Sequence, residues 1–381
     1  MTPHTVILGA GFGGLEVAAR LSDEYGADAN VTIIDAAEAF VFGFSKLDMM
    51  FRGYDLAAVR LPYSDYARPG VRFVHADITS IDPIAKVVTT SAGDFLADAL
   101  VVALGAGYDI AATPGLAELG HEFYSVAGAA RAAEAIARFN GGDIVIGVCG
   151  QGYKCPPAPH ECALLLHDAL TERGIREKCS ITVVSPLPVP LPPVPDLSNA
   201  FLQRYAERGI TFIGTHRVVS LESGAQTCAV LDDGSRLGAD LFLGIPVHKA
   251  PAVVVQSGLT DQGWIAVDRG FGRTAFDNVY AVGDVTSVGT AKAGVFAERA
   301  ARVVADLLIA RHRGLAEPAG YDGTGECFVE LGAGEVGGVS VDFFSREHPF
   351  GTFTDPAAVP DAAKDGFGAT RRTDWFIGAS R

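Results

Sequence analysis

A cysteine in a proline-framed loop is the residue of this chain best suited to redox or nucleophilic chemistry. The segment KCPPAPHE (154–161) places Cys155 after an apolar strand pattern and before an apolar helix pattern. A helix N-terminus and the neighbouring Lys154 are both expected to lower the pKa of its thiol and so to favour the reactive thiolate. His160 and Glu161 are close enough in sequence to carry protons for it. The alternative is a buried structural cysteine, which is the usual fate of a free thiol.

Four of the other cysteines are expected to be structural. Cys149 ends an apolar strand pattern and Cys162 lies in an apolar helix pattern, although either could form a bridge with Cys155. Cys179 and Cys228 lie beside expected strands. The mixed spacing, with no C-x-x-C, argues against a zinc site, and no metal site is expected.

Glycines near the start of the chain have the spacing of a dinucleotide-binding turn. In VILGAGFGGL (6–15), Gly9, Gly11 and Gly14 match G-x-G-x-x-G between a strand pattern and a helix pattern. The first glycine permits a tight turn, the second lets the backbone approach a pyrophosphate, and the third lets the helix pack on the strand. Asp35 ends the next strand pattern, 21 residues after Gly14, where an acidic side chain takes the ribose hydroxyls.

Two later segments complete such a site. DNVYAVGD (277–284) has the pattern of a strand that ends in Gly283 and Asp284. Glycine allows a ligand to approach the backbone closely, and the carboxylate accepts hydrogen bonds from sugar-like hydroxyls. A strand pattern over 99–104 is likewise followed by a glycine, Gly105. We expect these segments to lie against the same ligand.

A helix pattern over 295–310 follows the second of these segments, and Lys292 and Gly294 stand at its start. The partial positive charge of a helix N-terminus stabilises negative charge on a ligand placed against it. For Lys292, a role at such a site and the role of a solvated lysine at a loop end are weighed equally.

The middle of the chain predicts a second nucleotide-like unit that lacks a nucleotide site. DIVIGVCG (143–150) is again a strand pattern with a glycine turn, but three prolines and a lysine follow it. Because proline has no N–H and fixes φ, this turn cannot offer the free donors that a nicotinamide dinucleotide needs. The next strand pattern, 181–184, runs into a proline-rich segment, 186–195, instead of ending in an acidic residue.

These segments together resemble one group of FAD-dependent pyridine nucleotide-disulfide oxidoreductases. KCPPAPHE (154–161) is similar to the active-site loop of the flavin subunit of flavocytochrome c sulfide dehydrogenase and, more loosely, to that of sulfide:quinone oxidoreductases. YDGTGECFVE (321–330) resembles the stretch that carries their second redox cysteine, and AKAGVFAE (291–298) resembles the helix start before it. The likeness covers nearly the whole chain.

The resemblance implies a disulfide between Cys155 and Cys327 on one face of the flavin. Sulfide, or a related sulfur compound, would attack this disulfide and leave a persulfide, and the freed thiolate would pass electrons to the flavin and from there to a quinone or a protein acceptor. Glu161 would manage the proton, and Lys292 would lie at the flavin. The residues expected to bind FAD are Gly9, Gly11, Gly14, Asp35, Gly105, Gly283, Asp284 and Gly294.

Three departures from these families shape the expectations. Segment 121–127 lacks the third cysteine that is common in the quinone enzymes. FGF (42–44) stands near the place where the flavocytochrome subunit attaches its flavin through a cysteine, so FAD should be bound non-covalently. The tail, 361–381, lacks long amphipathic segments; its Arg371-Arg372 pair and its WFI (375–377) could touch a membrane or a partner, or could form a packed end.

Two other functions remain as alternatives. An NAD(P)H-dependent flavin reductase of the type II NADH dehydrogenase kind would also carry both FAD segments, but the turn at 147–153 speaks against it. A non-catalytic flavoprotein that senses redox state would bind a partner instead, and sulfur donors would not reduce it at a useful rate.

Composition limits the kind of molecule that positions these residues. A length of 381 residues predicts two or three domains, and 49% hydrophobic with 20% charged residues excludes a mainly disordered chain. A net charge of −15 argues against nucleic acid, whose binders cluster Lys and Arg. The chain as written shows no signal peptide and no apolar stretch suited to a spanning helix, so we expect a cytoplasmic location and leave peripheral membrane contact open.

The predicted fold is α/β, with two Rossmann-like domains and a small C-terminal cap. The FAD domain is expected to be discontinuous, over 1–113 and 250–317, with the second domain at 114–249 between its parts. Residues 318–381 are expected to form a hairpin, from 327–331 and 338–344, and a tail that together cap the flavin.

Overall fold

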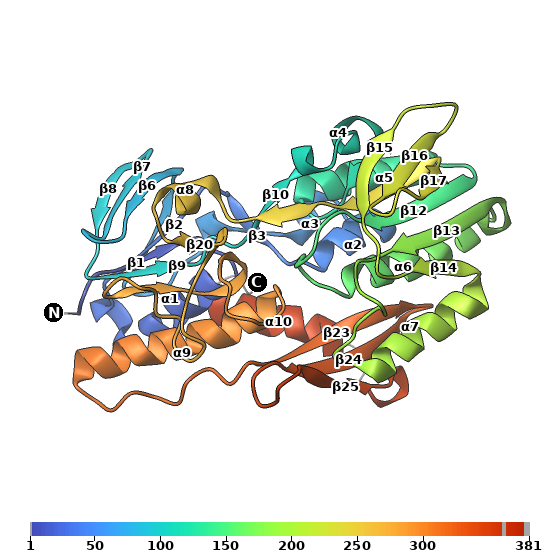
Figure 1. The fold of residues 1–381 in the computed structure, drawn as a ribbon. Coiled ribbons are helices and arrows are strands. Elements are labelled where there is room, and N and C mark those ends of the chain that lie inside the picture. The colour runs from blue at the N-terminus through green and yellow to red at the C-terminus, as the bar shows by residue number, and fades with distance from the viewer. Residues whose placement is uncertain (1, 360–362, 377–381) are drawn as a thin grey trace.

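The computed structural model describes residues 2–359 and 363–376. Figure 1 shows two α/β halves side by side, with a small C-terminal sheet below them. The two larger sheets contain five strands each, and every pairing within them is parallel. This arrangement confirms the predicted fold class.

The first sheet has the order β22-β9-β1-β2-β5. Its side chains alternate between two cores because successive residues of a strand point to opposite faces. Ile7 of β1 faces the core under α1 and α9, whereas Val6 and Leu8 face the opposite core. The bounds of these elements are Val279–Ala281 (β22), Ala99–Val102 (β9), Thr5–Leu8 (β1), Val31–Asp35 (β2), Val71–His75 (β5), Phe12–Tyr25 (α1) and Gly294–Arg313 (α9). Helix α9 confirms the helix predicted at 295–310.

The second sheet has the order β11-β18-β12-β13-β14, and helices α5, α6 and α7 share one core with it. Its strands are His121–Glu122 (β11), Leu241–Ile245 (β18), Gly142–Val148 (β12), Cys179–Val184 (β13) and Ile210–Ile213 (β14), and the helices are Val126–Arg138 (α5), Ala158–Glu172 (α6) and Pro195–Arg208 (α7). Each large sheet also has a three-stranded antiparallel partner. These partners are Ile78–Asp82, Val87–Thr90 and Gly93–Leu96 (β6–β8), and Val218–Glu222, Thr227–Leu231 and Arg236–Ala239 (β15–β17).

Short elements join these parts. Strands Gly107–Asp109 (β10) and Val247–Lys249 (β19) pair antiparallel at the two crossings between the halves. The other short elements are Ala39–Val41 (β3), Ser45–Phe51 (α2), Leu56–Val59 (α3), Arg60–Pro62 (β4), Leu116–Leu119 (α4), Ala252–Gln256 (α8), Thr260–Asp261 (β20) and Trp264–Ile265 (β21). The first sheet takes its strands from 5–102 and 279–281 and the second from 121–245, and on this membership we propose the four-part division of the chain given above.

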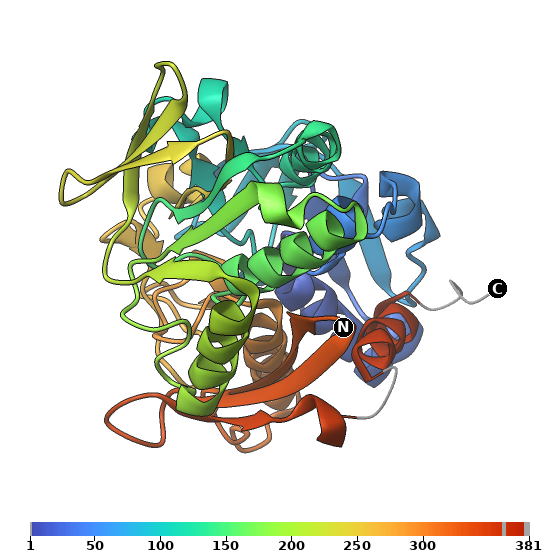
Figure 2. The same cartoon turned by 90° about the vertical axis from the view of Figure 1, so that its right-hand side faces the viewer.

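The C-terminal part contains more structure than the predicted hairpin. Strands Thr324–Gly332 (β23) and Glu335–Asp342 (β24) form the hairpin, a third strand, Phe350–Thr354 (β25), pairs with β24, and helix α10 spans Ala363–Trp375. Figure 2 shows this sheet passing below α7. Trp375 and Phe376 are fully buried, so these two residues of the tail pack inside the protein, whereas residue 377 lies outside the described residues.

No helix in the described ranges, 2–359 and 363–376, is long and apolar enough to cross a membrane. Over the same ranges, no group of three or more His, Cys, Asp and Glu side chains is placed to hold a metal ion.

Candidate active site

A cavity of about 380 Å³ lies where the first sheet, the cysteine loop and the C-terminal part meet. Ten of the twelve residues that the family resemblance assigns to catalysis or FAD binding line it: Gly11, Asp35, Gly105, Cys155, Glu161, Gly283, Asp284, Lys292, Gly294 and Cys327. The remaining two, Gly9 and Gly14, do not line it. The fold therefore brings together residues that are more than 300 positions apart in the chain.

The glycine turn leaves room for a ligand at one point and is closely packed at two others. A Cβ on Gly9, whose φ is +98°, would come within 2.5 Å of the Ala103 carbonyl oxygen, and a Cβ on Gly14 would come within 1.8 Å of the Gly9 oxygen. A Cβ on Gly11 would meet no atom within 4 Å, and this residue lines the cavity. The turn therefore has the open approach that a pyrophosphate needs in front of the start of α1.

Asp35 is held at the edge of the cavity by two backbone groups. Its Oδ2 accepts from the N–H of Ala10 at 2.6 Å, and its Oδ1 accepts from the N–H of Ala37 at 2.7 Å. Each carboxylate oxygen can accept a further hydrogen bond, so the side chain remains able to bind ribose hydroxyls.

Lys292 is held by the loop that precedes α9. Its Nζ donates to the backbone oxygens of Asp284 at 2.6 Å and Thr286 at 3.0 Å, and it lies 3.5 Å from the ring centroid of Trp264. Burial lowers the pKa of Lys292 to about 8, while the nearby Asp284 opposes that change. The lysine is therefore part of the cavity wall rather than a solvated side chain at a loop end.

The cysteine loop is tied to the start of α9 by its backbone. Cys155 N–H donates to the Lys292 carbonyl oxygen at 2.8 Å, and the Cys155 carbonyl accepts from Ala158 N–H at 2.9 Å as α6 begins. Cys155 has a φ of +48°, a conformation that non-glycine residues rarely adopt and that is found most often at functional sites. The surrounding contacts thus fix the thiol in the cavity wall.

The six cysteines, all of them free thiols in this structure, occupy different places. Cys155 and Cys327, the latter on β23, are the two that line the cavity. Cys149 is buried in the core on the opposite face of the second sheet, and Cys162 is fully buried in α6. Neither of these two thiols lines the cavity. The two cysteines that lie near Cys155 in sequence are therefore not exposed to the cavity, whereas Cys155 is.

The expected direction of the Cys155 pKa is wrong. Burial raises the pKa of its thiol well above the usual value, and Glu161 and Cys327 raise it further. The helix start acts in the expected direction through Ala158 N–H, and the cation that lowers this pKa is Lys46. Lys154 instead donates to the Ala106 carbonyl at 3.1 Å. Burial likewise raises the pKa of Cys327 to about 11.

Glu161 is buried between the two cysteines and a cluster of charges. Its Oε1 accepts from the backbone N–H of Glu330 at 2.9 Å, and Glu330 forms ion pairs with Lys364 and Arg52. Burial raises the pKa of Glu161 to about 7, although Lys364 and Arg52 act in the opposite direction. This carboxyl can therefore hold or release a proton near neutral pH.

His160, the other predicted proton carrier, points elsewhere. It is fully buried, and its Nδ1 lies 2.8 Å from the hydroxyl of Tyr205 on α7. Burial lowers the pKa of its imidazole to about 3. His160 does not line the cavity, so the prediction that it carries protons there is wrong.

Several cavity residues were missed by the sequence analysis. They are Phe12, Phe44, Lys46, Tyr124, Phe328, Lys364 and Phe367. Phe12 occupies a variable position of the glycine motif. Segments 42–44, 121–127 and 321–330 were compared with the related families, but Phe44, Tyr124 and Phe328 within them were given no role. For Lys364 and Phe367, the spacing of three residues was the signal that could have predicted a shared helix face, because residues three apart lie on the same face of a helix.

The chain is similar to known proteins over most of its length. The model of the pyridine nucleotide-disulphide oxidoreductase family matches residues 3–301. A sulfide-quinone reductase from Aquifex aeolicus is 26% identical over 333 residues, which cover 81% of this chain and 76% of that protein. An NADH dehydrogenase-like protein of Mycobacterium tuberculosis is 30% identical over 310 residues, which cover 74% of this chain and 73% of that protein.

Solved structures show the same fold. The crystal structure of the Aquifex aeolicus sulfide:quinone oxidoreductase superposes with a TM-score of 0.83 at 22% identity, covering 97% of this chain and 90% of that one. The resemblance to sulfide:quinone oxidoreductases that the cysteine loop suggested is thereby confirmed at the level of sequence and fold. The chain belongs to the pyridine nucleotide-disulphide oxidoreductase family and is an FAD-dependent oxidoreductase.

Proposed function

We propose that this enzyme oxidises sulfide or a related sulfur compound through a Cys155–Cys327 disulfide beside FAD and passes the electrons to a quinone. The observation that carries the proposal is the position of these two cysteines. They are 172 positions apart, yet both line the cavity that the two FAD-binding segments form. The Aquifex aeolicus relative, which is named for sulfide and quinone, supports the choice of substrates.

The first chemical step is thiol–disulfide exchange. Hydrosulfide attacks one sulfur of the Cys155–Cys327 disulfide, and that S–S bond breaks. A new S–S bond forms to the incoming sulfur, which gives a persulfide on one cysteine, and the other cysteine leaves as a thiolate. A second sulfur nucleophile then removes the outer sulfur, and a pair of thiols remains.

Glu161 supplies the proton in the first step and receives one later. Its pKa of about 7 lies below the value of about 11 for Cys327, so a thiolate released at Cys327 takes a proton from Glu161. When the two thiols form the disulfide again, they release two electrons and two protons, and the Glu161 carboxylate accepts one of the protons.

The residues of the cavity fit FAD. The open approach at Gly11 suits a pyrophosphate. The carboxylates of Asp35, which two backbone N–H groups hold, and of Asp284 suit the sugar-like hydroxyls on either side of that pyrophosphate. When bound, FAD supplies the acceptor for the two electrons. Because Phe42, Gly43 and Phe44 carry no nucleophilic side chain, we propose that it is held non-covalently.

A second candidate is favoured by relatives named for NADH. The Mycobacterium tuberculosis relative is NADH dehydrogenase-like, and a type II NADH:quinone oxidoreductase of Staphylococcus saprophyticus is 26% identical over 322 residues. The prolines that follow β12 are the feature of this chain that disfavours an NADH site.

Anaerobic addition of sulfide tests the proposed function. The visible spectrum of the flavin is recorded after sulfide is mixed with the wild type, Cys155→Ser and Cys327→Ser. The wild type is expected to be reduced rapidly. Each variant is expected to be slower by about 100-fold or more, because it cannot form the disulfide that sulfide attacks.

Cys162→Ser is the matched control, because Cys162 lies seven positions from Cys155 but does not line the cavity. We expect it to be reduced at the rate of the wild type. Reduction of Cys155→Ser and Cys327→Ser at that same rate would show the disulfide mechanism to be wrong.

A further inference from the structure

The C-terminal helix packs against the helix that starts at the glycine turn. Trp375, at the end of α10, is fully buried and has its ring centroid 5.4 Å from that of Phe12, in an edge-to-face arrangement. Phe12 is the first residue of α1, follows Gly11 directly and lines the cavity. Trp375 thus supports Phe12, which directly follows Gly11 of the glycine turn.

Phe376 makes a second, separate connection to the same turn. Its ring stacks on that of Tyr63 with the centroids 6.2 Å apart and the planes 14° from parallel. The Tyr63 hydroxyl donates to the carbonyl oxygen of Ala10, which lies between the first two glycines of the motif. Tyr63 is buried and lines the cavity as well.

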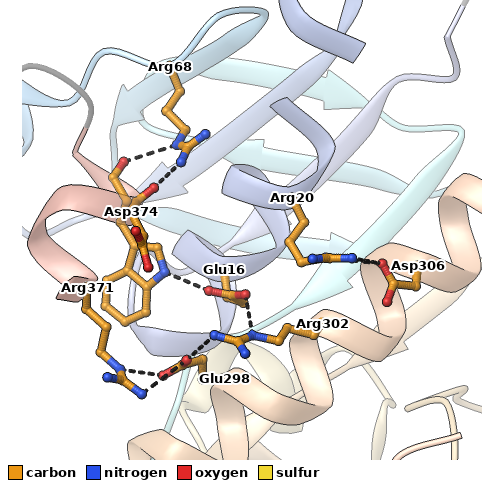
Figure 3. A network of polar contacts seen from close by, with 9 residues as sticks. Glu16, Arg20, Arg68, Glu298, Arg302, Asp306, Arg371 and Asp374 are labelled. Carbon is orange, nitrogen blue, oxygen red and sulfur yellow. Dashed lines mark hydrogen bonds and ion pairs between the residues drawn. The ribbon is translucent and has the colours of Figure 1, made fainter. Parts of the chain in front are cut away.

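Two buried carboxylates hold the end of α10 in place. Trp375 Nε1 donates to Glu16 Oε2 on α1 at 2.8 Å, and Arg371 Nε donates to Glu298 Oε2 on α9 at 2.6 Å. Arg302 joins the two acids, with Nε at 2.7 Å from Glu16 and a terminal nitrogen at 2.6 Å from Glu298. Figure 3 shows this network running from α10 to both helices. The mechanism uses none of these groups.

The backbone at the end of α10 is held in addition by Arg68. Its guanidinium donates to the carbonyl oxygens of Trp375, at 3.3 Å, and of Asp374. Arg68 is itself buried, and in Figure 3 it lies on the side of Asp374 opposite to α9. The position of the two aromatic side chains is therefore fixed by contacts to the backbone as well as to the side chains of α10.

We propose that Trp375 and Phe376 are positioning residues that brace the glycine turn through Phe12 and Tyr63, so that the C-terminal helix retains the flavin. The other end of α10 contributes Lys364 and Phe367 to the cavity wall. The same helix therefore lines the cavity at one end and supports the glycine turn at the other. The inference rests on the proposed non-covalent binding of FAD but not on the identity of the substrate. Its readout is therefore separate from sulfide oxidation.

Release of FAD from the holoenzyme tests this role. The fluorescence of free flavin is followed after dilution for the wild type, Trp375→Leu, Phe376→Leu and Trp375→Phe. We expect Trp375→Leu and Phe376→Leu to release FAD about tenfold faster, because each loses an aromatic contact to the turn. Trp375→Phe retains a ring against Phe12 and is expected to release FAD at a rate between those of the wild type and Trp375→Leu.

Arg20→Gln is the matched control. The Arg20–Asp306 ion pair joins α1 to α9 in the same region, as Figure 3 shows, without touching α10. We expect this variant to release FAD at the wild-type rate. A rate as fast as that of Trp375→Leu would show that packing between α1 and α9 in general, and not the contacts of Trp375, retains FAD, and would contradict the proposal. Folded Trp375→Leu and Phe376→Leu proteins that release FAD no faster than the wild type would overturn the proposal. If either leucine variant fails to fold, Trp375→Phe decides the question by the same comparison.

Discussion

Glu161 is a carboxyl group in this cavity whose pKa of about 7 suits proton transfer near neutral pH. Its carboxyl is buried, it lies beside two thiols whose pKa values are raised, and it accepts a hydrogen bond from the Glu330 backbone. Sequence reasoning could select Cys155, Cys327 and Glu161 by residue type and spacing. It could not predict the direction of the thiol pKa, because burial is a property of the assembled cavity and here outweighs the helix start.

Glu161→Gln is expected to lose one limb of the pH profile. We expect the step in which the disulfide forms again to limit flavin reduction at saturating sulfide. That step needs the Glu161 carboxylate, which becomes populated as the pH rises through about 7, so the rate should rise across that range. The variant should be slower by about 100-fold above neutral pH and should lack this rise. The measurement is the rate of flavin reduction in rapid mixing from pH 5 to 9. A variant with the same rising limb as the wild type would remove Glu161 from the mechanism.

At the scale of secondary structure elements, helix α10 is the main addition to what the sequence could predict. The strands and helices around the glycine turn follow from local patterns, and α9 was expected almost to its ends. The tail has no such pattern, because its apolar residues face a binding cavity and an aromatic cluster rather than a regular sheet. Strand β25 was not predicted either. It pairs with β24 across the loop 343–349, and no local pattern in the sequence marked it as a strand.

Lys364 of α10 sets part of the electrostatic field on Glu161. It forms an ion pair with Glu330, and it acts together with Arg52 to lower the pKa of Glu161. Asp48 on α2 acts in the opposite sense and raises the pKa of Glu161. The other titratable groups that interact with Glu161 have their own pKa values raised by it, and they are Cys155, Cys327, Cys162 and Tyr124.

Lys364→Met is therefore expected to shift the pH profile toward higher pH. Removing the cation removes an influence that lowers the pKa of Glu161, so the midpoint of the rising limb should move up, and Lys364→Arg should restore it. Lys249→Met, which removes an exposed lysine paired with Asp109, serves as the control. A midpoint that stays in place or moves down in Lys364→Met would contradict this account of the field.

At the scale of the whole molecule, two similar sheets are followed by different turns. Both contain five parallel strands, and in each a glycine turn follows a central strand, β1 or β12. The first turn continues directly into α1, whereas the second leads into prolines and places Cys155 against the first half of the molecule. The sequence indicated that the second unit lacked a nucleotide fingerprint, but only the folded chain could show that its loop completes the site of the first.

This difference predicts the response to a nicotinamide donor. Under anaerobic conditions, NADH at concentrations that saturate typical dehydrogenases is expected to reduce the flavin far more slowly than sulfide does, because the turn after β12 lacks the free donors for a pyrophosphate. The measurement compares the two donors on the same preparation. Rapid bleaching by NADH and not by sulfide would favour the NADH-dependent function instead.

Mapping the cysteines of the oxidised enzyme tests the central claim most directly. The protein is alkylated and digested without reductant before and after anaerobic addition of one equivalent of sulfide, and the peptides are identified by mass. We predict a cross-link between the Cys155 and Cys327 peptides that disappears with sulfide, with one of the two cysteines then carrying an extra sulfur. A cross-link from Cys155 to Cys149 or Cys162, or an oxidised enzyme in which Cys155 and Cys327 are both alkylated, would contradict it.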